Sequence, residues 1–318
     1  MHAHVRRSLG TTGLDVFPVC LGGNVFGWTL DRRGSFDVLD AYVEGGGNFI
    51  DTADGYSWWH PGNRGGESEA IIGAWLRRSG RRADMVIATK VGGDLAHGRT
   101  GLSPGHIRAA LESSLTRLGL DCVDLVYAHY DDPDTPLADT LSAFDELIRA
   151  GKVRAIGASN FSTDRLAESL ATSGRLGLAR YAALQPKYNL VERTFERELE
   201  PLCRREQLSV MPYIALAYGF LTGKYLPGQP LPDTPRAEEI AAAYLHDERS
   251  WKTLAALGRV ASRHGATRAQ VAIAWLLGRP AVTAPIASAT SPAQVRDLIS
   301  STEIPLREED RAELEAPH

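Results

Sequence analysis

The repeating unit of this chain is contained in residues 122–156, CVDLVYAHYDDPDTPLADTLSAFDELIRAGKVRAI. The apolar run at residues 122–130 is typical of a buried strand in a parallel sheet. A helix is predicted at residues 136–150, where Gly151 provides the stop signal, and residues 153–156 begin the next strand. A strand, a helix and a second strand in this order predict parallel strands joined by helices.

The same alternation of strand and helix runs along the whole chain. Eight strands are predicted, at residues 17–21, 48–51, 85–90, 122–130, 153–156, 182–185, 208–211 and 281–285. Helices are predicted at residues 35–44, 68–78, 103–118, 136–150, 163–172 and 195–206. Gly10 and Gly13 mark a hairpin before the first strand, and the proline-rich residues 227–235 are expected to form a surface loop. A length of 318 residues suits two modest domains or one large barrel.

The charge and composition argue against several classes of protein. The chain has 35 basic and 39 acidic residues and a net charge of −4, so no positive field is expected to attract nucleic acid or an anionic membrane. No apolar run approaches the roughly 20 residues of a membrane span, and residues 1–10 lack the apolar core of a secretory signal. The three cysteines, Cys20, Cys122 and Cys203, have no CxxC spacing. We therefore expect a cytoplasmic protein with reduced cysteines and no metal site.

Four ionisable side chains follow predicted strands: Asp51 and Tyr56 after the second, Lys90 at the end of the third and His129 at the end of the fourth. In a barrel the carboxyl ends of all strands open on one face, so these side chains are predicted to converge. An ammonium beside a phenol is expected to lower the pKa of the phenol, and a neighbouring carboxylate keeps the ammonium charged. Together they predict a proton-delivery site. Taken singly, each has an ordinary structural explanation, such as a turn cap, a loop aromatic or a packed histidine.

Six segments, in the same order, resemble the aldo-keto reductase superfamily. They are GGNFIDTADGY (46–56), IATK (87–90), DLVYAHYDDPDTPLADTLSAFDELIRAGKVRAIGASNFS (124–162), LQPKYNLVER (184–193), YGFLTGKY (218–225) and ASATSPAQV (287–295). The resemblance implies a single-domain (β/α)8 TIM barrel over residues 1–318, with an N-terminal β-hairpin and long βα loops. It also implies an NAD(P)H-dependent oxidoreductase that reduces an aldehyde or ketone to an alcohol. In that reaction Tyr56 would donate the proton, assisted by Lys90 and Asp51, and His129 would orient the carbonyl oxygen.

The expected cofactor is NADPH, with NADH as an alternative. No GxGxxG follows a strand, so barrel loops would hold the nucleotide. The resemblance assigns the nicotinamide to Ser159, Asn160, Gln185 and Tyr213, the pyrophosphate loop to Leu216, Gly219 and Leu221, and the adenosine to Ser288, Thr290, Ser291 and Gln294. Helix amides at residues 290–293 are expected to hold a 2′-phosphate. The lysine or arginine that NADPH-preferring members carry near residues 288–290 is missing from this sequence, and Arg296 follows only one turn later.

The substrate is expected to be a small carbonyl compound. Asn24, Trp28, Trp58 and Trp59 follow the first strand or the predicted catalytic tyrosine, so their loops would overhang the pocket. Aromatic walls favour an apolar or sugar-like compound. Packing within the loops is the alternative role for each tryptophan.

Two other functions remain open on the sequence alone. Lys90 could form a Schiff base in a lyase, which borohydride trapping would detect, although such an enzyme has no use for nicotinamide-binding loops. Because some relatives of the family serve a membrane channel, the chain could also be a nicotinamide-nucleotide-sensing regulatory subunit. That function predicts tight cofactor binding with negligible turnover.

Overall fold

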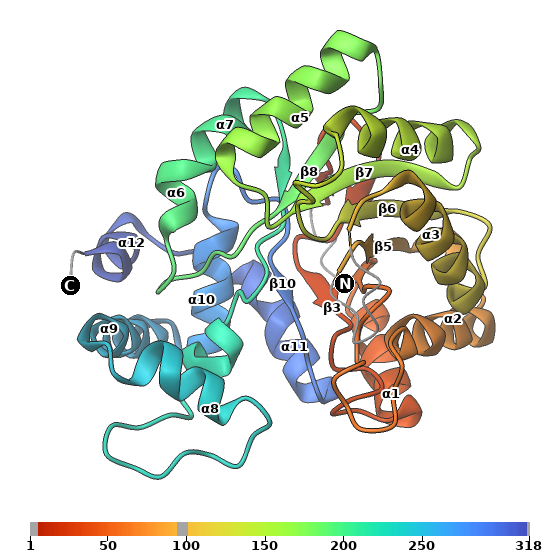
Figure 1. Cartoon of the computed structure of the whole chain (residues 1–318). Helices are drawn as coiled ribbons and strands as arrows, with labels where there is room; N and C mark the ends of the chain where they lie inside the picture. The colour runs from red at the N-terminus through yellow and green to blue at the C-terminus, as the bar shows by residue number, and fades with distance from the viewer. Residues whose placement is uncertain (1–5, 94–100, 317–318) are drawn as a thin grey trace.

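The computed structural model describes residues 6–93 and 101–316. Its centre is an eight-stranded parallel sheet with helices on the outside (Figure 1). In spatial order the strands are β10 (Ile286–Ala287), β3 (Cys20–Gly22), β4 (Phe49–Asp51), β5 (Val86–Val91), β6 (Val123–Ala128), β7 (Val153–Ser159), β8 (Tyr181–Gln185) and β9 (Ser209–Val210).

The two outermost strands, β9 and β10, meet and close the sheet. Val210 forms a parallel bridge with Val282. The N–H of Thr283 donates to the carbonyl oxygen of Val210, and the N–H of Ile286 donates to that of Pro212, each over 2.8 Å. The fold is therefore the predicted (β/α)8 barrel.

Helices follow the strands and cover the outer face of the barrel (Figure 1). The main ones are α1 (Arg32–Glu44), α2 (Glu67–Ser79), α3 (Pro104–Leu118), α4 (Leu137–Arg149), α5 (Thr163–Leu176), α9 (Glu248–His264), α10 (Arg268–Leu277) and α11 (Pro292–Ser300), with α12 (Glu308–Glu315) at the end. Their apolar sides pack on the sheet in a core that contains Trp75, Phe144 and Trp275. Ser103 caps the start of α3 by accepting from the N–H of His106, and Pro104 follows it in the first turn of the helix.

The predicted N-terminal hairpin is present as the antiparallel pair β1 (Arg7–Ser8) and β2 (Asp15–Val16). Its turn places Gly10 and Gly13 at φ values of 52° and 72°, which residues with a side chain rarely adopt. The hairpin adds apolar side chains to the core inside the barrel: Leu9, Leu14 and Val16. A Cβ on Gly10 would lie 3.2 Å from the carbonyl oxygen of Ala182, so the turn lies against the start of β8.

The first and last strands of the barrel, β3 and β10, begin later in the sequence than predicted. The first was expected at residues 17–21, but pairing begins only at Cys20. The N–H of Phe17 donates to the side chain of Asn48 over 2.7 Å, and Pro18 has no N–H to donate. The last was expected at residues 281–285, whereas β10 pairs with β3 through Ile286–Ala287.

The helix predicted at residues 195–206 is two helices, α6 (Thr194–Glu198) and α7 (Glu200–Arg205). Pro201 lies in the first turn of α7 and cannot donate a backbone hydrogen bond to the preceding turn, so the chain restarts its helix at that point. The loop predicted at residues 227–235 is confirmed, and it leads to α8 (Ala237–Ile240) and η3 (Ala241–Leu245).

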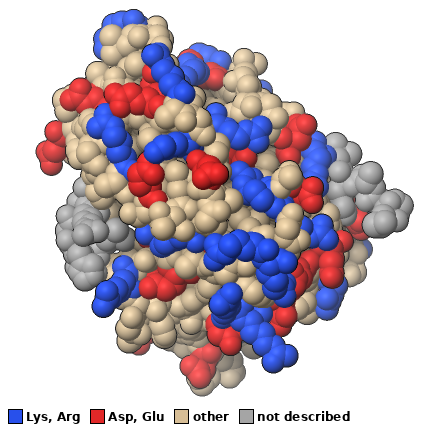
Figure 2. All heavy atoms as spheres, turned by 90° about the vertical axis from the view of Figure 1, so that its right-hand side faces the viewer, with Lys and Arg blue, Asp and Glu red and all other residues tan. Residues whose placement is uncertain are grey.

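The helical face formed by α2, α3 and α4 carries both signs of charge. Figure 2 shows many lysine and arginine side chains there, with acidic side chains among them. Ion pairs join Arg78 to Asp40 at 2.5 Å and Arg108 to Glu146 at 2.6 Å. Within the described residues, no helix combines the length and the apolar composition that crossing a membrane requires.

Candidate active site

A buried lysine organises the floor of the barrel's open end. Lys90, on β5, is 0% exposed. Its ammonium donates to Asp51 Oδ2 on β4 over 2.6 Å, to the hydroxyl oxygen of Tyr56 over 2.8 Å and to the carbonyl oxygen of Thr52 over 2.8 Å. Gln185, at the end of β8, donates to the other oxygen of Asp51 over 2.9 Å. The strand ends around the barrel therefore bring together side chains that are 34 to 134 residues apart in the sequence.

The electrostatics of this group keep Lys90 charged and Tyr56 protonated. Burial by itself would lower the pKa of Lys90, but Asp51 and Tyr56 outweigh burial and the net shift is upward. Burial raises the pKa of Tyr56, and Lys90 opposes this rise without cancelling it. The lysine thus acts in the predicted direction, but the lowered tyrosine pKa expected from the sequence is corrected to a raised one.

His129 follows β6 and faces the same cavity as Tyr56. The centres of the two rings are 6.3 Å apart. Burial lowers the pKa of His129 to about 3, and Lys90 adds to the decrease, so the imidazole is neutral in the ordinary pH range. A neutral imidazole carries one N–H donor, which suits a hydrogen bond to a carbonyl oxygen.

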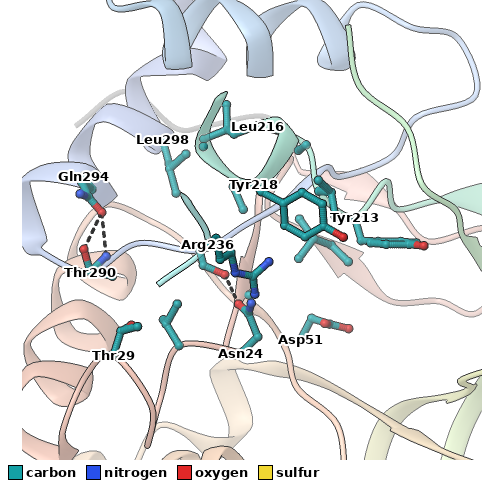
Figure 3. A pocket seen from close by; sticks show the side chains of 18 of the residues that line it. Asn24, Thr29, Asp51, Tyr213, Leu216, Tyr218, Arg236, Thr290, Gln294 and Leu298 are labelled. Atoms are coloured by element: carbon teal, nitrogen blue, oxygen red, sulfur yellow. Dashed lines mark hydrogen bonds between the residues drawn. The ribbon is translucent and has the colours of Figure 1, made fainter. Parts of the chain in front are cut away.

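These side chains lie at one end of a cavity of about 660 Å³ at the carboxyl ends of the strands. Figure 3 shows Asp51 and Tyr213 toward one end, Thr290 and Gln294 toward the other, and Arg236 between them. The volume falls within the range of small-molecule and cofactor sites, roughly 300–1,000 Å³. The structure therefore gathers residues from nearly every strand end around a single elongated pocket.

The segments that follow β7 and β9 contribute a hydrogen-bonded set of polar side chains to the cavity. Tyr213 donates from its hydroxyl to Asn160 Oδ1 over 2.7 Å. Asn160 Nδ2 donates to the carbonyl oxygen of His129 over 2.9 Å and to Ser159 Oγ over 3.1 Å. Asn160 Oδ1 retains a second lone pair, so this group can still accept from an amide.

The chain segment after β9 lines the cavity in a strained conformation. Ile214, Ala217 and Tyr218 have φ values of 54°, 49° and 56°, and φ above zero is rare for a β-branched residue such as Ile214. The segment is held in place by Asn189, whose side chain donates to the carbonyl oxygen of Ile214 over 3.0 Å. Strain of this kind concentrates at functional sites.

The far end of the cavity is built by β10 and the start of α11. Ser288 hydrogen-bonds to Asn24, which follows β3. Thr290 donates to Gln294 Oε1 from its backbone N–H over 2.7 Å and from its hydroxyl over 3.1 Å. The polar side chains here are exposed or half-buried, in contrast with the buried lysine-centred end.

Most predicted site residues line the cavity, and four do not. The predicted residues on its surface are Asn24, Trp28, Asp51, Tyr56, Trp59, His129, Ser159, Asn160, Gln185, Tyr213, Leu216, Gly219, Ser288, Thr290 and Gln294. Lys90 lies directly beneath it. Leu221 is fully buried in the outer core, Ser291 caps α11, and Trp58 is absent from the lining.

Several lining residues were not singled out from the sequence. Arg236 lies 5.2 Å from the ring of Trp28 and 5.0 Å from that of Tyr218, so it joins the loop after β3 to the segment after β9. Lys224 and Tyr130 also line the cavity. Lys224 belongs to the segment YGFLTGKY, one of the segments that resemble the family, so the sequence could have identified it as a candidate site residue. Arg236 directly follows the proline-rich loop at residues 227–235, and only the tertiary structure shows that it reaches the cavity.

Comparison with known proteins places this geometry in a family. The model of the Aldo/keto reductase family matches residues 18–317. The chain belongs to that family. An uncharacterized oxidoreductase, YrpG of Bacillus subtilis (strain 168), is 36% identical over 308 residues, which cover 95% of this chain and 92% of YrpG.

Other relatives of this aldo/keto reductase carry different names. The NADH-specific methylglyoxal reductase of Escherichia coli (strain K12) is 32% identical over 331 residues, or 95% of this chain and 94% of that protein. A probable voltage-gated potassium channel subunit beta of Arabidopsis thaliana is 33% identical over 307 residues, or 94% and 91% of the two chains. The family and these relatives support an oxidoreductase that uses a nicotinamide cofactor on small carbonyl compounds.

Proposed function

We propose that this aldo/keto reductase reduces an aldehyde or ketone to an alcohol with NAD(P)H, using Tyr56 as the proton donor. The observation that carries the proposal is the buried ammonium of Lys90, which donates to both Asp51 and the Tyr56 hydroxyl at the floor of the cavity. A fully buried ammonium loses its hydration, and an ion pair with a carboxylate compensates for that loss of free energy.

The cavity residues fit a nicotinamide nucleotide. Asn160 Oδ1 keeps a free lone pair, and Gln185 lines the same cavity, so both side-chain amides offer an oxygen that can accept from a carboxamide. Tyr213 offers an aromatic face whose hydroxyl is fixed by Asn160. Leu216, Gly219 and Lys224 would hold the pyrophosphate, while Ser288, Thr290 and Gln294 would hold the adenosine. When bound, the cofactor supplies a hydride to the carbonyl carbon.

The protein's own residues handle the proton. Tyr56 accepts a hydrogen bond from Lys90, so its own O–H proton is available to the oxygen of the substrate. Loss of that proton leaves a phenolate next to the ammonium, which stabilises the negative charge. Neutral His129 would donate its N–H to the same oxygen and share the charge that develops there.

The mouth of the pocket favours a flat or apolar carbonyl compound. Trp28 and Trp59 pack edge to face with ring centres 5.5 Å apart, and Trp59 lies 6.1 Å from the ring of Tyr56. Trp59 is 37% exposed and Tyr130 is 48% exposed, so apolar surface remains available to a substrate. We assign Asn24, Trp28 and Trp59 to the substrate side.

The two alternative functions have less support. All three protons of Lys90 are engaged by Asp51, Tyr56 and the Thr52 carbonyl, which leaves no free amine for a Schiff base. The similarity to a channel subunit is the reason to consider a sensing function. A protein that only senses the nucleotide has no use for the proton-delivery group of Asp51, Tyr56, Lys90 and His129.

The test is oxidation of NADH and NADPH by the purified protein with a panel of aldehydes and ketones, alongside Tyr56→Phe. The variant is expected to lose about 10²–10⁴-fold in kcat, the usual worth of a positioned acid, and to bind the nucleotide as before. Unimpaired turnover in Tyr56→Phe would remove this residue from the proposed role. Binding without turnover of any compound would favour the sensing function.

A further inference from the structure

We infer that Tyr130 is a positioning residue for the proposed reaction, because its ring stacks on the imidazole of His129 and holds it in the orientation in which it donates to the carbonyl oxygen. The two residues follow directly after β6. Their ring centres are 4.9 Å apart, with 23° between the ring planes. The inference rests on the proposed function, since it concerns the reaction in which His129 shares the charge of the substrate oxygen.

Hydrogen bonds fix the backbone of this segment on both sides of the stacked rings. The N–H of His129 donates to the last carbonyl oxygen of β5 over 2.9 Å, and its own carbonyl oxygen accepts from Asn160 over 2.9 Å. After Tyr130, the carboxylate of Asp131 accepts from two nitrogens of Arg165, over 2.8 and 2.9 Å. These bonds set the course of the chain, so the remaining freedom lies in the side-chain torsions.

Packing against other rings orients the imidazole of His129. Its Nδ1 is buried and has no hydrogen-bond partner among residues 6–93 and 101–316. The ring of Tyr56 meets the imidazole at 71°, with the ring centres 6.3 Å apart, and the ring of Tyr130 stacks on it. An aromatic pair stabilises its own geometry beyond the area that it buries. The stacked ring therefore does for this histidine what a hydrogen bond to a ring nitrogen often does for others.

Gly93, the second residue after β5, lies against the same imidazole. A Cβ on Gly93 would be 2.7 Å from Nδ1 of His129 and 3.4 Å from its Cε1, whereas an ordinary contact is about 3.5–4.0 Å. Any larger residue at this position would therefore push the ring aside. Gly93 is not among the residues that line the cavity, so a substitution there moves the imidazole without changing the wall that a substrate contacts.

Direct contact with the substrate is the other role open to Tyr130, because this residue is 48% exposed and lines the cavity. The two roles predict different kinetics. Loss of a contact that the substrate makes before and during the reaction raises KM for compounds large enough to reach the ring. Loss of a positioned imidazole lowers kcat for every compound, since the charge that develops on the carbonyl oxygen is common to all of them.

The test compares Tyr130→Phe, Tyr130→Ala and Gly93→Ala with the unmodified full-length protein, using the bulkiest and the smallest carbonyl compounds that it reduces. Tyr130→Ala should lower kcat about two- to tenfold with both, the contribution of one aromatic pair, and leave KM for the smallest compound unchanged. Tyr130→Phe keeps the stacked ring and should keep kcat, whereas Gly93→Ala should lower it. In a His129→Gln background, Tyr130→Ala should have no further effect.

NMR of protein that is isotope-labelled at histidine gives a second readout, which needs no turnover. The ring current of Tyr130 shifts the imidazole signals of His129, which His129→Gln assigns. This shift should persist in Tyr130→Phe and be lost in Tyr130→Ala. Leu176→Ala is the matched control, because Leu176 is also 48% exposed and does not line the cavity, and it should change neither kcat nor the shift.

Four results would overturn the inference: a raised KM with unchanged kcat in Tyr130→Ala, a reduced kcat in Tyr130→Phe, an undiminished effect of Tyr130→Ala in the His129→Gln background, or imidazole signals that Tyr130→Ala leaves in place. Absence of turnover in the unmodified protein overturns the proposed function itself. The ring-current shift separates that outcome from a failure of the stacking.

Discussion

The two ends of the cavity are built in opposite ways. At the lysine-centred end, Lys90 and Asp51 are buried on adjacent strands and joined by bonds of 2.6–2.9 Å that also include Tyr56 and Gln185. At the proposed adenosine end, Thr290 and Gln294 are exposed residues of a loop and a helix start, and they bond to each other. The buried charges at the lysine-centred end compensate each other, so loss of one leaves the other without a partner. The exposed hydrogen bond between Thr290 and Gln294 can be replaced by bonds to water at little cost in free energy. Substitutions should therefore have large effects on stability and rate at one end, and small effects on selectivity at the other.

The largest effect is expected for Lys90→Met. The substitution leaves Asp51 buried without its partner, which should lower the free energy of unfolding by about 3–5 kcal/mol. It also removes the cation that stabilises the phenolate, so kcat should fall by about 10²–10⁴-fold. Urea unfolding and steady-state kinetics measure the two effects.

Lys252→Met is the control for this substitution, because Lys252 is half exposed and, among the residues that the structure describes, pairs with Glu248 alone, on its own helix. Its loss should change the free energy of unfolding by about 0.5 kcal/mol at most. Equal destabilisation by the two substitutions would contradict the proposed compensation of Asp51 by Lys90.

A smaller effect is expected on acid stability. The pKa of His129 is about 3 in the folded protein, below its ordinary value of 6.5, so the unfolded chain binds more protons between these values. The contribution of neutral His129 to the free energy of unfolding is therefore fully present above pH 6.5 and is lost as the pH falls toward 3. Between pH 6.5 and pH 5 the protein should lose about 2 kcal/mol that His129→Gln does not lose.

The measurement is urea unfolding of both proteins at the two pH values. Burial raises the pKa of Asp54 to about 7, so Asp54 makes the free energy of unfolding change with pH in the opposite direction to His129. This contribution is the same in the unmodified protein and in His129→Gln, and the difference between the two proteins therefore reports His129 alone. Parallel pH profiles would contradict a histidine that is buried in its neutral form.

The smallest effect is expected at the adenosine end. Gln294→Ala frees the N–H of Thr290, so the ratio of the NADPH and NADH dissociation constants should shift toward NADPH by about two- to tenfold, the worth of one hydrogen bond. The free energy of unfolding should stay within about 0.5 kcal/mol, because Gln294 is exposed. Fluorescence titration and urea unfolding measure both. A large loss of stability would show that the two ends are not built as differently as their contacts indicate.

The sequence predicted the lysine-centred end well because its residues adjoin strong local signals. Apolar runs ending in Asp51, Lys90 and His129 indicate strand ends, and parallel strands require those ends to lie on one face. The direction of the Tyr56 pKa shift was predicted wrongly, because it depends on how deeply the side chain is buried, and local sequence patterns do not specify burial. Trp58, expected at the pocket, does not line it and packs edge to face against Trp59.

The adenosine end could be predicted only in part. The motif around Ser288 and Thr290 is the basis for predicting it, but the hydrogen bonds from Thr290 to Gln294 and from Gln270 to Asp297 depend on how α10 and α11 pack. Arg236 reaches the cavity through contacts with Trp28 and Tyr218, which are 208 and 18 residues away. No local pattern specifies such a contact.

By itself the sequence determined the alternation of strands and helices, the membership of a barrel family and the four side chains at the strand ends, because periodicity and motif order are local properties of the chain. Only the tertiary structure decided where the last strand pairs, how burial sets the pKa of Tyr56 and His129, and which donors of α11 remain free. These depend on which distant residues exclude water or supply a partner, and that is fixed when the barrel closes.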